Sequence, residues 1–248
     1  MSSRLDRELV IRGLARSRQQ ARELIDTGKV LVNARPATKA AVLVQAVDDI
    51  AVTEPDRYVS RAAHKLHAAL AASQLSVPRR VLDAGASTGG FTQVLLEAGA
   101  QRVYAVDVGH EQLVGQLRSD PRVVVREGLN LRNLVIADVE DEPVELVVAD
   151  VSFISIRLLL QPLFSVLAGE GRALLLVKPQ FEVGRGHLDD RGVVRDDRLR
   201  QQAVDDVIAD AAALGWVVDW QAESQLPGES GNLEYFVAFS RTVDVSQA

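Results

Sequence analysis

The chain has 248 residues, no cysteine and a net charge of −6, which suits a large domain joined to a smaller one and excludes disulfides and thiolate metal sites. Residues 1–45 carry nine Lys and Arg against four Asp and Glu, a charge of +5 that leaves −11 for the remainder and indicates a basic module attached to an acidic body. The first residues do not form a signal peptide and no apolar run approaches about 18 residues, so we expect a cytoplasmic protein that does not bind membranes.

The basic module is predicted over residues 1–54. Apolar residues recur at helical spacing in two stretches of residues 4–26, and Gly28 ends the second helix. Strands are predicted over 30–33 and 49–53. Arginines around the helices suit bidentate contacts with RNA phosphates, although a solvated arginine face is the alternative, and the absence of aromatic residues disfavours base stacking here. The RNA contacts predicted in this module are Arg4, Arg12, Arg16, Arg18, Arg22 and Lys29.

A short linker is predicted over residues 55–60, and the second domain over 61–248. The linker is followed by a helix whose apolar stripe comprises Leu66, Leu70 and Leu75.

Residues 80–91 organise the second domain as a strand, a tight glycine loop and a helix. The spacing Gly85-x-x-x-Gly89-Gly90 departs from the dinucleotide fingerprint G-x-G-x-x-G. Glycine lets a ligand approach the backbone, and the start of the helix offers free amide donors. Asp83, on the strand before the loop, repels a pyrophosphate but attracts a sulfonium and its amino group.

A second strand, residues 102–107, ends in Asp107, whose carboxylate can accept both hydroxyls of a ribose. These features together resemble the S-adenosylmethionine pocket of Rossmann-like methyltransferases; the alternative is a packed βαβ turn with a helix-capping acid. The predicted cofactor contacts are Asp83, Gly85, Ser87, Thr88, Gly89, Gly90, Phe91, Asp107 and, in the loop where an adenine ring would lie, Asn130.

The rest of the chain alternates strand and helix until the last two strands. Strands are predicted over 123–125, 145–150, 173–179, 216–220 and 234–239, and helices over 112–117, 158–167 and from about 197 to 214. The last two strands are joined by a turn-rich segment, which permits an antiparallel final strand. We therefore predict an α/β fold: a Rossmann-like class I methyltransferase with a seven-stranded sheet whose last strand is reversed.

Four charged residues are predicted to meet at the carboxyl edge of this sheet, where ligands of open α/β sheets bind. They are Lys65, Asp150, Lys178 and Glu234. Capping of a helix by Asp150 and solvated lysines are the alternatives, whereas an unpaired, half-buried Glu234 would be costly.

These four residues look like the Lys-Asp-Lys-Glu tetrad of the RrmJ-type (FtsJ-like) RNA ribose 2′-O-methyltransferases. Residues 13–33 resemble an S4-type RNA-binding domain, and the segments 178–184 and 192–196 extend the likeness. From about residue 4 to 240 the chain resembles the TlyA family, ribosomal RNA cytidine 2′-O-methyltransferases that are also named haemolysins. The resemblance implies 16S and 23S rRNA substrates at the ribosomal subunit interface and S-adenosylmethionine as cofactor, with no metal.

One segment departs from the family pattern: Asp56-Arg57-Tyr58-Val59 replaces the Arg-Ala-Trp-Val of some actinobacterial members, which puts domain coupling through the tryptophan in doubt. Further RNA contacts are predicted at Arg61, Arg185 and Arg195, although an ordinary solvent loop over 182–197 is an equal alternative.

A ribose hydroxyl holds its proton too tightly for fast attack at neutral pH, so a base or strong polarisation must act on it. A lysine takes a proton only when neutral, which burial and a nearby cation favour and carboxylates oppose. We assign Lys178 to deprotonate or orient the hydroxyl, Lys65 as its cationic neighbour, and the two acids to orient the lysines. The competing interpretations are a membrane-active haemolysin, an NAD-dependent oxidoreductase and an RNA-binding protein with an inactive methyltransferase body.

Overall fold

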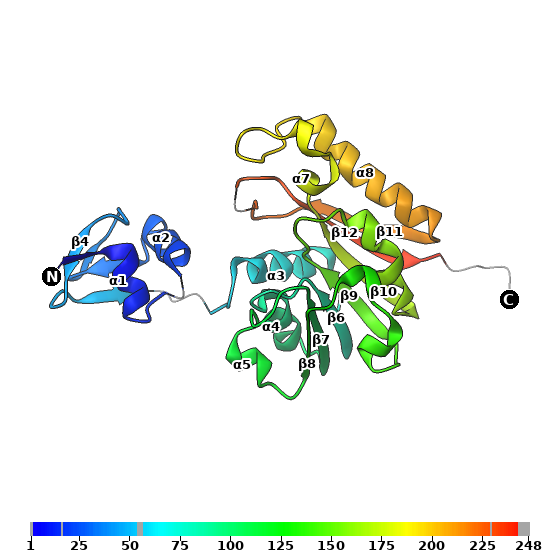
Figure 1. Ribbon diagram of the computed structural model, residues 1–248, viewed down its shortest axis with the longest axis horizontal. Helices are drawn as coiled ribbons and strands as arrows, with labels where there is room; N and C mark the ends of the chain where they lie inside the picture. Colours follow the sequence, from blue (N-terminus) through cyan, green and yellow to red (C-terminus); the bar gives the residue numbers. More distant parts are fainter. Residues whose placement is uncertain (1, 16, 54–56, 229, 243–248) are drawn as a thin grey trace. The chain divides into compact units, whose positions relative to one another are not determined.

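The computed structural model describes residues 2–15, 17–53, 57–228 and 230–242, and the chain divides into two compact units at Arg57 and Tyr58 (Figure 1). Each unit is described by itself. The predictions for Arg16 and for linker residues 55 and 56 lie outside the described residues, and the domain limits given above stay a prediction.

The first unit contains the two predicted helices, α1 (Leu5–Ile11) and α2 (Arg18–Asp26). Its strands are β1 (Ser2–Arg4), β2 (Val30–Val32), β3 (Arg35–Pro36), β4 (Leu43–Gln45) and β5 (Ile50–Val52). Strand β2 pairs antiparallel with β3 and β5, and β1 pairs antiparallel with β4. The apolar helical stripes meet the strands in one small core that includes Leu5, Leu9, Ala21, Ile25 and Val30.

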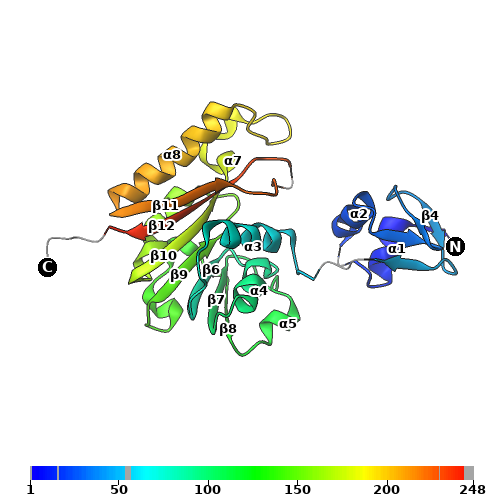
Figure 2. The same cartoon turned by 180° about the vertical axis from the view of Figure 1, so that it is seen from behind.

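The second unit is built on a seven-stranded sheet with the order β11-β12-β10-β9-β6-β7-β8 (Figures 1 and 2). The strands are β6 (Arg80–Ala84), β7 (Arg102–Asp107), β8 (Val123–Glu127), β9 (Val144–Ala149), β10 (Leu167–Val177), β11 (Trp216–Glu223) and β12 (Tyr235–Arg241). Strand β12 is antiparallel to both of its neighbours, β10 and β11, whereas the pairs from β10 to β8 are parallel. The predicted reversal of the last strand is confirmed.

Helices cover both faces of this sheet, so its central strands are nearly continuous apolar runs. Alternate residues of β10 point to opposite faces: Leu175 belongs to the core beneath α6 (Leu160–Ser165) and α8 (Asp197–Ala213), and Leu174 to the core beneath α3 (Arg61–Ser73) and α4 (Gly90–Glu97). The remaining elements are the short helices α5 (Gly115–Arg118) and α7 (Pro179–Glu182) and the 3₁₀ turns η1 (Leu131–Asn133), η2 (Ile136–Val139), η3 (Ile156–Leu159) and η4 (Arg185–His187).

Two predicted helices differ in the structure. The helix predicted over 158–167 is wrong at both ends, because its first residues form η3 and β10 already begins at Leu167. The helix predicted over 112–117 is observed as the shorter α5, Gly115–Arg118. Leu113 and Leu117 pack beneath Gly89, where an added Cβ would lie 2.7 and 2.3 Å from their methyl carbons. The apolar spacing therefore reflects contact with the glycine loop rather than a long helix.

Candidate active site

The glycine loop after β6 passes over the end of β9. Gly85 has φ +88°, and a Cβ added to it would lie 2.7 Å from the carbonyl oxygen of Asp150. Only glycine therefore fits both the left-handed backbone and the close approach. The contact places the predicted cofactor loop directly beside the predicted catalytic acid.

The loop is tied to β7 through Asp107. Its Oδ2 accepts a hydrogen bond from the Ser87 amide at 2.8 Å, and its Oδ1 accepts one from the Gly109 amide at 2.7 Å. Each carboxylate oxygen has further lone pairs, so Asp107 retains acceptor capacity for the hydroxyls of a ribose.

Asp83 is a buried carboxylic acid beneath the loop. Thr92 Oγ1 donates a 2.6 Å hydrogen bond to its Oδ2, whereas its Oδ1 has no hydrogen-bond partner among the described residues. Burial raises the pKa of Asp83 to about 7; the hydrogen bond from Thr92 opposes this rise, and the charge of Asp150 adds to it. An unpaired acceptor at such a place is costly unless a donor or cation arrives, which fits the sulfonium cofactor expected here.

The other residues of the predicted cofactor set differ in exposure. Phe91 is buried and stacks on Phe236 in the core. Asn130 caps η1 by accepting a hydrogen bond from the Arg132 amide, and Ser87 is exposed with φ +47°. Their contacts with the cofactor, like those of Thr88, Gly89 and Gly90, stay predictions.

Lys178 and Asp150, two members of the predicted tetrad, form an ion pair at the end of β10. Lys178 is 9% exposed, and its Nζ lies 2.6 Å from Asp150 Oδ1. The same Nζ donates a 2.9 Å hydrogen bond to Ser152 Oγ. Asp150 holds its place because its amide donates to the Ala84 carbonyl, which joins the ends of β9 and β6.

The second pair is buried next to the first. Lys65 Nζ, from α3, donates a 2.6 Å hydrogen bond to Glu234 Oε2, and Glu234 is 2% exposed. The two pairs are neighbours because Val177 pairs with Tyr235 across β10 and β12, which sets Lys178 opposite Glu234. The structure thus brings all four predicted residues to one edge of the sheet.

Gln180 holds the second pair through Glu234, and the sequence did not predict it as a site residue. Its Nε2 donates a 3.0 Å hydrogen bond to Glu234 Oε1, so that both carboxylate oxygens of Glu234 are engaged. A polar residue two positions after Lys178, on the turn that leaves the strand, was the available signal.

Phe153 was also missed. It is 93% exposed, has φ +65° and lies 5.4 Å from the ring of Phe181, centroid to centroid. A bulky residue in the left-handed region is rare, and such strain gathers at functional sites. Nothing in the local sequence distinguishes this phenylalanine from a core residue.

The loop predicted to contact RNA is fastened to the turn that carries Glu234. Asn232 is buried; its Nδ2 donates to the Gly192 carbonyl and its Oδ1 accepts from the Val194 amide, both at 3.0 Å. Within the loop Arg195 pairs with Asp189 at 2.8 Å, and Arg185 is exposed. Their RNA contacts, like that of the half-buried Arg61, stay predictions.

In the first unit Arg12 serves the fold. Its guanidinium donates to Glu8 Oε1 at 3.0 Å and to the carbonyls of Asp48, Gln45 and Ala46 at 2.7 to 3.3 Å. Arg4, Arg18 and Arg22 instead converge on Asp6 with their side chains about half exposed. Arg12 therefore has the fewest donors left for a phosphate.

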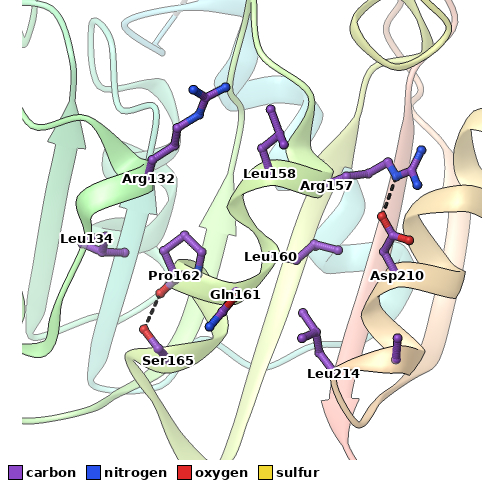
Figure 3. A pocket seen from close by; sticks show the side chains of 11 residues that line it. Arg132, Leu134, Arg157, Leu158, Leu160, Gln161, Pro162, Ser165, Asp210 and Leu214 are labelled. Carbon is purple, nitrogen blue, oxygen red and sulfur yellow. Dashed lines mark hydrogen bonds and ion pairs between the residues drawn. The ribbon is translucent and has the colours of Figure 1, made fainter.

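A groove of about 660 Å³ lies between the η3–α6 segment and α8 and contains none of the predicted site residues (Figure 3). Arg157 at its rim is already paired with Asp210 at 2.6 Å, and Leu158 is 55% exposed. The groove is thus separate from the tetrad. None of the helices in the described part of the chain is long and apolar enough to cross a membrane.

Known families match both units. The FtsJ-like methyltransferase family matches residues 58–241 and the S4 domain matches residues 3–50. A 16S/23S rRNA (cytidine-2'-O)-methyltransferase TlyA of Mycobacterium tuberculosis is 51% identical over 238 residues, 95% of this chain and 88% of that protein. Hemolysin A of Brachyspira hyodysenteriae is 40% identical over 95% of this chain and 99% of its own.

A solved structure of a Streptococcus thermophilus protein, described as a candidate hemolysin, superposes with a TM-score of 0.77 at 37% identity and covers 99% of this chain and 92% of its own. S-adenosylmethionine is the methyl donor that an FtsJ-like methyltransferase domain implies. The seven-stranded sheet with its reversed strand, the identities and the coverage lead to one conclusion: the chain belongs to the TlyA family, with an S4 domain followed by an FtsJ-like methyltransferase domain.

Proposed function

We propose that the second unit transfers a methyl group from S-adenosylmethionine to the ribose 2′-hydroxyl of a cytidine in ribosomal RNA, and that the first unit binds the same RNA. The observation that carries the proposal is the two ion pairs, Lys178–Asp150 and Lys65–Glu234, each at 2.6 Å, with Asp150 beside the glycine loop. Three buried charges and a largely buried fourth are costly to keep for stability alone.

Lys178 is the residue that we assign to the 2′-hydroxyl. An ammonium has three N–H donors; one is hydrogen-bonded to Ser152, while Asp150 is held as an ion-pair partner at 2.6 Å, which leaves a donor for the substrate oxygen. A hydrogen bond from Lys178 holds that oxygen and stabilises the negative charge it gains as its proton departs. Asp150 takes one proton from the Lys178 ammonium, and the neutral amine that results takes the proton of the 2′-hydroxyl while the oxygen–carbon bond forms and the carbon–sulfur bond breaks.

Lys65 and Glu234 support this step. Lys65 contributes a second positive charge near the reacting oxygen, and Glu234 fixes its ammonium at 2.6 Å. Gln180 in turn holds Glu234, so the second pair is oriented before the substrate arrives. Positioning of this kind supplies much of the rate in a methyl transfer, because the attacking oxygen, carbon and sulfur must be in line.

Lys178 is only 9% exposed, and we propose that the target nucleotide is unstacked from its helix when its 2′-hydroxyl reaches this lysine. We assign Phe153 to stack on the unstacked base, supported by its exposure and by its place three residues after Asp150. Cytidine as the base and 16S or 23S rRNA as the substrate are taken from the names of relatives such as the M. tuberculosis protein. An rRNA substrate assigns the reaction to the cytoplasm and the ribosomal subunits.

The test is a map of 2′-O-methyl groups on 16S and 23S rRNA from cells with and without the gene, complemented by the parent chain or by Lys178→Ala. The expected result is a modified cytidine that depends on the parent chain and is not restored by the variant. Unchanged methylation in the absence of the gene, together with no transfer to ribosomal subunits by the purified protein, would overturn the proposal.

A further inference from the structure

Asp6 is a fully buried carboxylate on which three arginines converge. Arg4 donates to it through Nε at 3.0 Å and through Nη2 at 3.2 Å. Arg18 Nη2 and Arg22 Nε both donate to its Oδ2, at 3.0 and 3.3 Å.

These residues come from three elements of the first unit. Arg4 ends β1, Asp6 lies in the first turn of α1, and Arg18 and Arg22 stand one turn apart on the same face of α2. The carboxylate also lies near the positive end of α1. The cluster is therefore assembled by the fold itself, before any ligand binds.

The positive charge of the cluster is partly exposed, whereas its negative charge is buried. Three cations and one anion leave a net charge of +2, and the arginine side chains are 44%, 54% and 54% exposed whereas that of Asp6 is 0% exposed. Each guanidinium carries five N–H donors, and Asp6 occupies one or two of them. Because about half of each arginine side chain is exposed, part of this positive charge faces solvent.

We propose that Asp6 is a positioning residue that holds Arg4, Arg18 and Arg22 as one preassembled site for a phosphate of the RNA backbone. The inference rests on the proposed binding of rRNA by the first unit and adds to it how the contacts are organised. A free arginine loses side-chain entropy when it binds a phosphate, and three neighbouring guanidiniums repel one another. Asp6 removes both costs before RNA arrives, which is preorganisation.

A substitution of Asp6 distinguishes this positioning role from non-specific attraction between the basic unit and RNA. Asp6→Asn keeps the shape of the side chain and makes the unit more basic by one charge, and Asp26→Asn, at an exposed position on α2, adds the same charge elsewhere. Non-specific attraction alone predicts that both variants bind RNA more tightly than the parent. Positioning predicts that Asp26→Asn binds at least as tightly and that Asp6→Asn binds about tenfold more weakly, the factor expected for one lost charge-assisted hydrogen bond.

The measurement is the affinity of each full-length variant for a labelled 23S rRNA fragment over a range of salt concentrations, with circular dichroism to check the fold. For Asp6→Asn the slope of log affinity against log salt should fall by about one unit. Equal or tighter binding by folded Asp6→Asn would overturn the inference while leaving the proposed function intact. Failure of the parent chain to bind the RNA would instead refute the proposed function.

A second pair of variants decides the question if Asp6→Asn does not fold. Arg18→Lys and Arg22→Lys retain the charge and leave Asp6 ionised, but a lysine has no planar fork to engage Asp6 and a phosphate together. Each is expected to bind the fragment several-fold more weakly at unchanged net charge. Parent-like affinity in both would show that charge alone acts here and would overturn the inference.

Discussion

Lys65 Nζ and Glu234 Oε2 lie 2.6 Å apart although 169 residues separate them in the sequence. The contact joins the first helix of the second unit to the turn before its last strand. Because Gln180 holds the other oxygen of Glu234 at 3.0 Å, the acid is fixed from both sides. The consequences of this arrangement can be measured residue by residue.

Lys178→Ala is expected to lower kcat by about a thousandfold or more, because it removes the group that holds the attacking hydroxyl and leaves Asp150 without its partner. The dissociation constant of S-adenosylmethionine, measured by calorimetry, should stay within about twofold. Arg79→Ala, which removes an exposed cation just before β6, at the opposite end of that strand from the glycine loop, is the control. An equal loss of cofactor binding and methylation would contradict the role of Lys178.

Gln180→Leu should lower kcat by about ten- to a hundredfold, because Glu234 loses the hydrogen bond that fixes its Oε1. Single-turnover kinetics on ribosomal subunits should show little change in the KM for RNA. Gln180→Glu sets a second carboxylate beside Glu234. The ratio of its activity to that of the parent should therefore be higher at low pH than at high pH. A parent-like kcat in Gln180→Leu would exclude the positioning of Glu234 by Gln180 from the mechanism.

Asp83 should make stability depend on pH. Its pKa is raised by burial to about 7 from a model-peptide value of 3.8, so the folded state binds more protons than the unfolded state between these values. The stabilisation is complete below about pH 4 and is lost as pH rises to about 7. Thermal melting should therefore show that the parent loses more stability than Asp83→Asn between pH 5 and pH 8, and parallel curves would contradict this.

The same group predicts proton release on cofactor binding. A cation beside Asp83 favours its ionised form, which lowers its pKa. Calorimetry at pH 7 in buffers of different ionisation enthalpy should detect protons released by S-adenosylmethionine binding to the parent and fewer released by Asp83→Asn. Equal release in both proteins would assign the proton to another group.

Phe153→Ala should reduce kcat/KM for RNA by about ten- to a hundredfold, the range that corresponds to loss of one base–aromatic stack. Phe153→Trp should retain most activity, because it preserves the stacking surface. Leu158→Ala, which truncates another exposed apolar residue, is the matched control. Activity that falls equally in the alanine and tryptophan variants would indicate that the backbone conformation at 153, rather than stacking, is required.

Much of this fold follows from local patterns. Apolar runs between glycine-rich turns predicted the seven strands, and the missing helix between the last two predicted the reversal that the pairing of Leu175 with Val237 displays. The gathering of Lys178 and Asp150 followed from a general property of parallel sheets, whose carboxyl ends share one edge. These features depend on short segments or on topology.

Contacts that depend on how far individual side chains reach could not be predicted from the sequence. The position of β12 between β10 and β11 is set by non-local pairing, to which no single segment points. The hydrogen bond of Gln180, the convergence of arginines on Asp6 and the engagement of Arg12 by backbone carbonyls require the packed structure. The helix predicted over 158–167 exists as α6, but its end was placed too late, because the apolar Leu167 suits the start of a buried strand equally well.

The insertion of β12 between two strands that precede it has a consequence for synthesis. A nascent chain that has emerged only as far as β11 leaves the edges of β10 and β11 without their shared partner strand. It contains Lys65, Asp150 and Lys178 but not Glu234. The tetrad is complete only when β12 has paired with β10 and β11. The edge of the sheet that carries the tetrad therefore depends on pairing between segments that lie far apart in the chain.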